Sequence, residues 1–387
     1  MANEAKTSIT FRDLLRNKGY YDDPNVTIEE QKSDNAKIDK LLKNASKRGN
    51  KNGMPDFILY SSIYPELIIV VECKADINKH QSETMDNYAD YAIDGALLYA
   101  SFLSKEFDVL AIGISGENNC SISHFLQLKD EKIAHKIFGD TVLSIDEYYN
   151  GIIQSNYKFN QDYAKLVVYT KTLNEALHAK KIKESQRALL ISGILIALKS
   201  EAFKSGYKKH KKVASLVNNI YNTIGDELAN SDIPAKTVST LTQAFTFLKT
   251  NPTLTDEKTG KKYLEDLIDE IDREINGFMT THKYVDTVSQ FYIEFLRYAN
   301  NDKGLGIVLT PPHITDLFVE LADVDKNSIV LDNCCGTGGF LISAMKRMLI
   351  NANGDKTKEN DIKEKQLVGI EFQDDIYTLL VSNMIIH

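Results

Sequence analysis

Two carboxylates and a lysine stand at the ends of two neighbouring apolar segments. Asp56 begins the segment 56–60, and Glu72 and Lys74 follow the apolar run of the segment 67–73. Side chains alternate along a strand, so Glu72 and Lys74 share one face, and Asp56 joins them if the segments pair as a hairpin. Two such carboxylates favour a hard divalent cation, which we expect to be Mg²⁺. The cation polarises a phosphate and activates water, while the lysine orients that water or stabilises charge.

The alternative interpretation is structural, because polar strand ends and Pro-Asp turns are common. Three features favour chemistry. The run 67–71 is that of a buried central strand, where an ending at Glu72 is costly without a function. A basic loop, 46–53, precedes the first carboxylate and can meet DNA phosphates. Gln81 then opens the expected helix 81–103.

This pattern resembles the PD-(D/E)xK nuclease superfamily, in the version attached to restriction enzymes, over residues 27–126. The resemblance implies that Asp56 and Glu72 are the metal ligands. It makes Lys74 the catalytic lysine and Gln81 an accessory active-site residue. A further acid in this superfamily often comes from the preceding helix. The choice among the four candidates stays open: Glu29, Glu30, Asp34 and Asp39.

A second group of residues lies near the end of the chain, where 329–340 reads I-V-L-D-N-C-C-G-T-G-G-F. A short apolar run, a glycine-rich turn and an amphipathic segment predict strand, turn and helix. Glycines let the backbone take positive φ and let a ligand approach, and the following helix N-terminus presents unpaired N–H groups. A second expected strand, 367–371, ends in Glu371, which is placed to accept hydrogen bonds from ribose hydroxyls. Together these features predict a site for a nucleotide-like cofactor.

With the preceding Thr-Pro-Pro, these segments resemble the adenine-specific N6 DNA methyltransferases of restriction–modification systems. The resemblance implies an S-adenosylmethionine site in which Thr310 and Pro311 pack against the methionine end of the cofactor. The glycine loop cradles its amino-acid portion and Glu371 holds the ribose. Asn333 stands where the family usually has proline, a change expected to alter the turn rather than the ligand. The residues carried over are Thr310, Pro311, Asp332, Gly336, Gly338 and Glu371.

The catalytic Asn-Pro-Pro-Tyr of that family, or a close variant, is absent from the sequence. The third strand of such a domain would follow His387. We therefore expect the N-terminal portion of a longer enzyme, or a truncated product. A target-recognition domain or specificity subunit is expected C-terminal to this chain or outside it.

Composition sets the remaining limits. The chain has 387 residues, 43% of them hydrophobic, and a net charge of −8, which argues against a uniformly basic coat but not against local basic patches. The lysine-rich run 204–212 can follow a DNA backbone or simply cap a helix. No apolar run has the length of a membrane span and no signal peptide is recognisable, so we expect a cytoplasmic protein. The four cysteines lack metal-site spacing and are expected to be reduced packing residues.

The expected fold class is α/β multidomain. A PD-(D/E)xK nuclease domain occupies 1–150, an all-α helical connector 151–300, and the start of a Rossmann-like S-adenosylmethionine-dependent methyltransferase domain 301–387. Expected helices are 9–16, 28–42, 81–103, 188–203, 213–228, 238–248, 263–275 and 287–298. Expected strands are 56–60, 67–73, 109–114, 121–126, 329–332 and 367–371.

These inferences predict a bifunctional type II, IIG-like restriction–modification enzyme. It would cleave double-stranded DNA with Mg²⁺ and methylate a flipped adenine at N6, the methylation half being incomplete in this chain. No Walker-type phosphate loop occurs, which disfavours ATP-driven relatives. Two alternatives remain open. One is an adenine methyltransferase or modification subunit with an inactive nuclease-like domain, and the other is a non-catalytic DNA- or cofactor-binding fragment.

Overall fold

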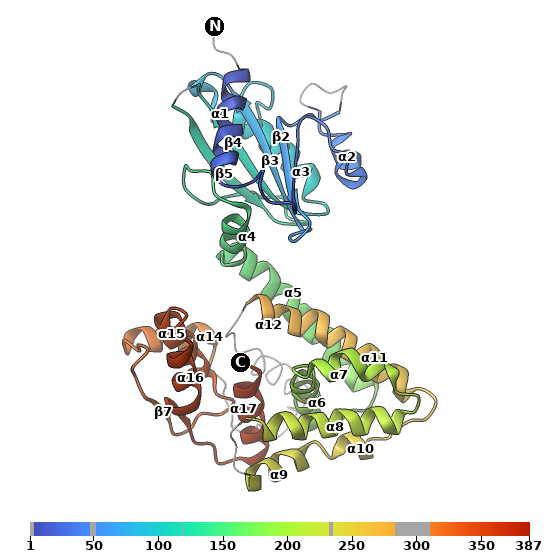
Figure 1. Cartoon of the computed structure of the whole chain (residues 1–387). Helices are drawn as coiled ribbons and strands as arrows, with labels where there is room; N and C mark the ends of the chain where they lie inside the picture. The colour runs from blue at the N-terminus through green and yellow to red at the C-terminus, as the bar shows by residue number, and fades with distance from the viewer. Residues whose placement is uncertain (1–3, 47–51, 118, 232–234, 283–309) are drawn as a thin grey trace. The chain divides into compact units, whose positions relative to one another are not determined.

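A computed structural model describes residues 4–46, 52–117, 119–231, 235–282 and 310–387. The chain forms two compact units, Met1–Phe159 and Asn160–His387 (Figure 1). Each unit is built around its own packed core. The division into three domains stays a prediction, since the expected connector and methyltransferase region belong to one unit here.

The first unit is organised around a six-stranded sheet, with the strands in the order β1-β2-β3-β4-β5-β6. β3 and β4 are parallel, and every other neighbouring pair is antiparallel. The expected hairpin is confirmed, because Phe57 of β2 faces Val71 of β3. The strands are β1 (Val26–Glu29), β2 (Phe57–Ser61), β3 (Leu67–Lys74), β4 (Asp108–Ser115), β5 (Ser121–Gln127) and β6 (His135–Lys136).

Helices cover both faces of this sheet (Figure 1). α1 (Glu4–Asn17) and α4 (Ile145–Ile153) pack on one face, and α2 (Ala36–Leu42) and α3 (Ala92–Leu103) on the other. β3 is therefore buried on both sides, which explains its continuous apolar run. Burial is worth roughly 25 cal/mol per Å² of apolar surface, so the strand is fixed by packing from both layers.

Two expectations about this unit are wrong at element boundaries. The expected helix 28–42 starts too early. Residues 28 and 29 belong to strand β1, because they pair with β2, and α2 begins only after its cap Asn35. α3 begins at Ala92 rather than at 81. The loop before it is held by the Asp94 side chain, which accepts hydrogen bonds from the backbone N–H groups of Ser82 and Asn87. Such side-chain bonds compete with helix formation.

The second unit begins with a helical part, as the sequence predicts. Its central helix α6 is buried over almost its whole length, which matches a helix that is apolar all round. The expected helix 287–298 lies outside the described residues. The helices are α5 (Asn156–Ala179), α6 (Glu184–Ala197), α7 (Glu201–Gly206), η2 (Tyr207–Lys209), α8 (Val213–Ala229), α9 (Ala235–Ala244), α10 (Phe247–Thr250), α11 (Gly260–Ile271), η3 (Asp272–Asn276) and α12 (Gly277–Thr281).

The last part of the second unit has the expected strand–turn–helix order. β7 and β8 are parallel, with Asp332 facing Gly369. The charged segment between the two strands holds a helix, α16, which the sequence did not predict and which Asp355 caps. The elements are α14 (Pro312–Leu321), β7 (Val330–Asp332), α15 (Gly339–Ala352), α16 (Lys356–Lys365), β8 (Leu367–Gly369) and α17 (Asp374–Ile386).

Three further observations concern the cysteines, the lysine-rich run and the helices within the described residues. All four cysteines are free thiols, but Cys334 is exposed and so does not serve packing. Part of the lysine-rich run is neutralised locally, since Lys204 pairs with Asp272 and Lys208 with Asp269. Among the helices that the structure describes, none has the length and apolarity needed to cross a membrane.

Candidate functional site

The strand register brings the first three predicted residues to one edge of the first unit's sheet. Phe57 faces Val71, so Asp56, one position earlier, lies opposite Glu72. The backbone N–H of Cys73 donates to Oδ2 of Asp56 at 2.6 Å. Because β-strand side chains alternate, Asp56, Glu72 and Lys74 share the face that carries α3.

Glu72 and Lys74 form a buried ion pair at this edge. Nζ of Lys74 lies 3.1 Å from Oε1 of Glu72, and the side chains are 12% and 2% exposed. Burial lowers the pKa of Lys74, but the negative charges of Glu72 and Glu4 and hydrogen bonds to both outweigh it, so the pKa is raised. Lys74 is therefore an ammonium at neutral pH, suited to stabilising negative charge rather than to removing a proton.

Glu4 is a residue of this group that the sequence reasoning missed. It begins α1, and its Oε1 lies 3.3 Å from Nζ of Lys74. Three of the four acids considered from the sequence make contacts elsewhere: Glu30 pairs with Arg12, Asp39 pairs with Lys43, and Glu29 accepts from the hydroxyl of Tyr60 and the N–H of Asp34. The fourth, Asp34, is exposed. An acid in the first turn of the first amphipathic helix was the available signal.

Two glycines, also missed from the sequence, let α3 approach Glu72. A Cβ on Gly95 would lie 3.1 Å from Cγ of Glu72 and 3.0 Å from a backbone oxygen. Gly113 faces Glu72 across β3 and β4, and a Cβ there would lie 2.5 Å from Cδ1 of Ile93. The absence of both side chains seats the first turn of α3 directly on the carboxylate.

Gln81 is not a member of the ion pair. It stands on the loop between η1 (Ile77–Lys79) and α3, and its side chain is exposed. Within the described residues, no three His, Cys, Asp or Glu side chains are grouped to hold a metal ion. The donor set at this edge nevertheless fits Mg²⁺, which proteins hold through one or two carboxylates together with water and substrate phosphate. Asp56 and Glu72 are the residues that would hold it.

The second predicted site lies where β7 and β8 end. The N–H of Ile370 donates to the carbonyl of Asp332 at 2.9 Å, and the N–H of Cys335 donates to the carbonyl of Ile370 at 3.1 Å. Glu371 reaches the glycine loop, since its Oε2 accepts from the N–H of Gly336 at 3.1 Å. Asp332, Gly336 and Glu371 are thus brought together at the carboxyl ends of two parallel strands, where open α/β sheets bind ligands.

The glycine loop is also shaped by packing. Gly336 and Gly338 have φ of +55° and +93°, a conformation that favours glycine. A Cβ on Gly338 would lie 2.7 Å from Leu380, so this glycine admits α17 as well as turning the chain. Nδ2 of Asn383, on the same helix, donates to the carbonyl of Thr337 at 2.9 Å.

Thr310 and Pro311 stand immediately before α14, half-buried and exposed respectively. α14 is tied to α15 by the hydroxyls of Thr315 and Ser343, which lie 2.7 Å apart. This contact orients the start of α14 toward the helix that follows the glycine loop. The structure does not bring Thr310 or Pro311 into the hydrogen-bonded group around Glu371.

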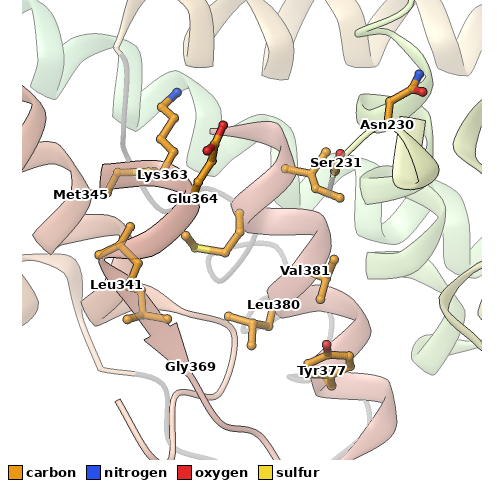
Figure 2. A pocket seen from close by; sticks show the side chains of 13 residues that line it. Asn230, Ser231, Leu341, Met345, Lys363, Glu364, Gly369, Tyr377, Leu380 and Val381 are labelled. Carbon is orange, nitrogen blue, oxygen red and sulfur yellow. The ribbon is translucent and has the colours of Figure 1, made fainter. Parts of the chain in front are cut away.

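The second unit also has a cavity of about 450 Å³ (Figure 2). It contains none of the residues predicted to bind the cofactor. Its lining comes from α15, β8 and α17, from Lys363 and Glu364 of α16, and from Asn230 and Ser231 just after α8 (Figure 2). Two of its lining residues nevertheless adjoin the second predicted site, since Gly369 faces Asp332 and Leu380 lies against Gly338.

Comparison with known proteins gives the class of the second site. Residues 283–387 match the N-6 DNA Methylase family. The matched range includes the glycine loop and Glu371. The chain is therefore a mixed α/β protein with a methyltransferase domain. This agrees with the resemblance drawn from Thr-Pro-Pro, the glycine loop and the acid after the second strand.

The whole chain is similar to a particular kind of enzyme. It is 31% identical over 400 residues to the Type II restriction enzyme and methyltransferase RM.BcgI of Heyndrickxia coagulans, covering 95% of this chain and 61% of that protein. It is also 30% identical over 112 residues to the Type I restriction enzyme MjaIX methylase subunit of Methanocaldococcus jannaschii, and 28% identical over 96 residues to the Type I restriction enzyme EcoEI methylase subunit of Escherichia coli. These two matches cover 28% and 25% of the chain and 19% of each relative. The resemblance to a fused restriction–modification enzyme is confirmed, and the chain spans about three-fifths of that relative.

Proposed function

We propose that this chain carries the nuclease and cofactor-binding parts of a type II restriction–modification enzyme of the IIG-like kind. Its first unit would have the PD-(D/E)xK fold and cleave double-stranded DNA with Mg²⁺. Its last part would bind S-adenosylmethionine for methylation of adenine at N6. The observation that carries the proposal is the convergence of Asp56, Glu72 and Lys74 on one face at one edge of a buried sheet.

The polar residues of the first unit divide the cleavage reaction between them. Bound by Asp56 and Glu72, Mg²⁺ would supply charge that polarises the phosphodiester and favours hydroxide over water. Lys74, held as an ammonium, would stabilise negative charge that develops on the phosphate. Glu4 would keep Lys74 charged and oriented, since Glu4 and Glu72 both contact Nζ of Lys74. Gln81 would be an accessory residue facing the DNA.

The residues of the second site would hold the cofactor. Oε1 of Glu371 accepts from the N–H of Gln373 at 2.8 Å while Oε2 accepts from Gly336. Each carboxylate oxygen has a further lone pair, which leaves capacity for ribose hydroxyls. Asp332 and the glycine loop with Gly338 would surround the amino-acid portion, and Thr310 and Pro311 would close its methionine end.

The proposed partners follow from the same reading. The substrate would be double-stranded DNA, and a target-recognition domain or a specificity subunit would select the site. The similarity to type I methylase subunits supports the second form of partner. The residues that take up the flipped adenine would lie outside the motifs present in this sequence, because it has no Asn-Pro-Pro.

The decisive test is cleavage of supercoiled plasmid DNA in Mg²⁺ by wild type and Lys74→Ala. We expect the variant to lose cleavage by at least a hundredfold, which corresponds to about 2.7 kcal/mol of transition-state stabilisation, while calorimetry shows unchanged affinity for S-adenosylmethionine. Lys158→Ala is the matched control. Nζ of Lys158 lies 2.8 Å from Oδ2 of Asp108, so this variant also removes a buried ion pair. Asp108 lies at the opposite end of the parallel strands β3 and β4 from Lys74.

Equal cleavage by wild type and Lys74→Ala would refute the nuclease assignment. One observation favours the alternative of an inactive nuclease-like domain: among the described residues, no three His, Cys, Asp or Glu side chains are grouped so that they could hold a metal ion. That alternative predicts that wild type leaves plasmid DNA intact in Mg²⁺ yet binds S-adenosylmethionine. The same experiment therefore separates the two functions.

A further inference from the structure

The imidazole of His80 bridges two strands next to the proposed nuclease site. His80 follows β3 and the short helix η1, and its Nδ1 lies 2.9 Å from Oγ of Ser115. Its Nε2 lies 3.0 Å from Oγ of Ser123 on the neighbouring strand β5. Ser115 is directly opposite Lys74 in the register of β3 and β4. Both ring nitrogens are thus used to hold the loop across the strand ends beside Lys74.

The same loop is also tied to the start of α3 on both sides of Gln81. The carbonyl of His80 accepts from the N–H of Ile93 at 2.9 Å. The fully buried carboxylate of Asp94 accepts from the N–H of Ser82 at 3.1 Å and from the hydroxyl of the same serine. It also accepts from the N–H of Asn87 at 2.9 Å. Asp94 precedes Gly95, the residue that rests against Glu72.

Gln81 is therefore the exposed residue between two anchored neighbours. His80 ties it to the strand beside Lys74, and Ser82 ties it to the helix turn beside Glu72. The hydrogen bonds on both sides fix the backbone next to Gln81. Fixing the backbone of one residue costs about 1–2 kcal/mol of conformational entropy. A loop that needed only to connect β3 to α3 would not require a buried carboxylate and a doubly bonded imidazole, since burial of such groups is costly without a gain.

We propose that His80 and Asp94 are positioning residues that fix Gln81 at the edge formed by Asp56, Glu72 and Lys74. The proposal rests on the nuclease function proposed above. Its content is that the two anchors act on cleavage through the amide side chain of Gln81. They would not contact the DNA or the metal ion themselves. Loss of an anchor would then cost no more than loss of Gln81.

A double-mutant cycle tests this directly, using the full chain, plasmid DNA and saturating Mg²⁺ under single-turnover conditions. We expect His80→Ala and Gln81→Ala each to lower the cleavage rate at least tenfold. We expect the double variant to be no slower than the slower single variant, because the second change removes a function already lost. Asp94→Asn replaces one acceptor oxygen. It should lower the cleavage rate by a smaller factor, and combining it with Gln81→Ala should again give no further loss.

His124 provides the matched control. It is a buried imidazole with both nitrogens bonded, to the carbonyl of Gly139 at 2.8 Å and the hydroxyl of Tyr148 at 2.7 Å. Its effect on the rate should multiply with that of Gln81→Ala, since it acts on the unit as a whole. If His80→Ala fails to fold, Ser115→Ala and Ser123→Ala each remove one partner of the ring and enter the same cycle.

The outcomes are distinct. If the enzyme cleaves DNA and the effects of His80→Ala and Gln81→Ala on the rate multiply, this inference is wrong and the nuclease function still stands. A wild-type chain without Mg²⁺-dependent cleavage would overturn the nuclease function and the inference with it. Rates of the double variant equal to those of the slower single variant, together with multiplying effects for His124, would support the inference.

Discussion

Lys74 and Lys158 illustrate how similar residues serve different ends. Each forms a buried ion pair, with Glu72 at 3.1 Å and with Asp108 at 2.8 Å. Asp108 also accepts from the N–H of Lys129 at 2.8 Å, so its oxygens are taken up by the fold. Lys74 instead contacts a further carboxylate, Glu4, at 3.3 Å, and shares a face of the sheet with Asp56. A gathering of like charges costs stability, and such a cost is typical of functional sites.

Protonation of His124 gives a prediction for the stability of the first unit. The carbonyl of Gly139 can only accept, so Nδ1 carries the proton and Nε2 accepts from Tyr148. Burial lowers the pKa of this imidazole. An unfolded histidine has a pKa of about 6.5. As the pH falls below that value the unfolded chain therefore takes up a proton that the folded unit resists, and stability present above it is lost.

The measurement is denaturant unfolding at pH 7.5, 6.5 and 5.5. His124 should contribute a fall in unfolding free energy of at most about 1.4 kcal/mol per pH unit below the unfolded pKa. His124→Gln should be less stable than wild type at pH 7.5 and show a shallower pH dependence. A variant with the same pH dependence as wild type would assign the proton uptake to other groups.

Glu371 gives a prediction for the second site at the same scale. Its carboxylate organises the glycine loop through Gly336 and would receive the ribose. Glu371→Ala should weaken S-adenosylmethionine binding about tenfold or more, since a charge-assisted hydrogen bond is worth about 1.5–3 kcal/mol. Asp375→Ala, which removes an exposed charge in the first turn of α17, is the control and should keep its affinity. Unchanged calorimetric affinity of Glu371→Ala would remove this residue from the site.

At the scale of elements, local patterns predicted those parts whose partners are close in sequence. The β2–β3 hairpin and the strand–turn–helix from Val330 to Ala352 are short-range units, and both are present as expected. β1 was misassigned because its strand character depends on pairing with β2, some 30 residues later. Gly95 and Gly113 were missed for the same reason, since their role appears only where α3 meets Glu72.

At Gly113 the first turn of α3 packs closely on β4, so substitution of this glycine tests how α3 is positioned. A Cβ there would lie 2.5 Å from Cδ1 and 2.8 Å from the backbone nitrogen of Ile93. The backbone atom cannot turn aside, so Gly113→Ala should push the first turn of α3 off the sheet at a cost of about 1–3 kcal/mol. Thermal unfolding should show the loss, and Gly139→Ala, where nothing lies within 4 Å, should not.

The cleavage assay then adds a functional consequence for the same variant. If the seat of α3 positions Glu72, Gly113→Ala should cleave DNA more slowly even at temperatures where it is fully folded. Retention of wild-type stability would show that α3 accommodates the methyl group. The opposite pattern, full activity with lowered stability, would separate packing of α3 from the geometry of Glu72.

For the whole molecule, the sequence predicted two chemistries on one chain more readily than the fine structure of either site. The motif residues Asp56, Glu72 and Lys74 carried the first prediction, and Asp332 and Glu371 the second. Glu4, His80 and Asp94 were not foreseen, because each reaches its site from a distant or irregular segment. Such contacts are set by tertiary packing, which residue spacing along a chain does not encode.

The second unit exposes one face of the β7–β8 pair. Leu331, Val368 and Ile370 are 63%, 43% and 54% exposed, and Phe372 is 97% exposed. Val330 and Leu367, the alternating neighbours of Leu331 and Val368, instead pack against α15. Exposed apolar patches of this kind promote association. In the part of the chain that the structure describes, β7 and β8 each pair with one strand only, so each has an unpaired edge.

We therefore expect this chain to self-associate through that face, with the tendency rising with salt as charge repulsion is screened. Leu331→Thr combined with Phe372→Ser should lower both the weight-average mass in sedimentation velocity and the fluorescence of a bound apolar dye. The free energy of unfolding should change little, because these side chains are largely in water already. Val168→Thr, an exposed valine of α5, is the control and should alter neither signal. An equal response of the two variants would show that association does not depend on the β7–β8 face.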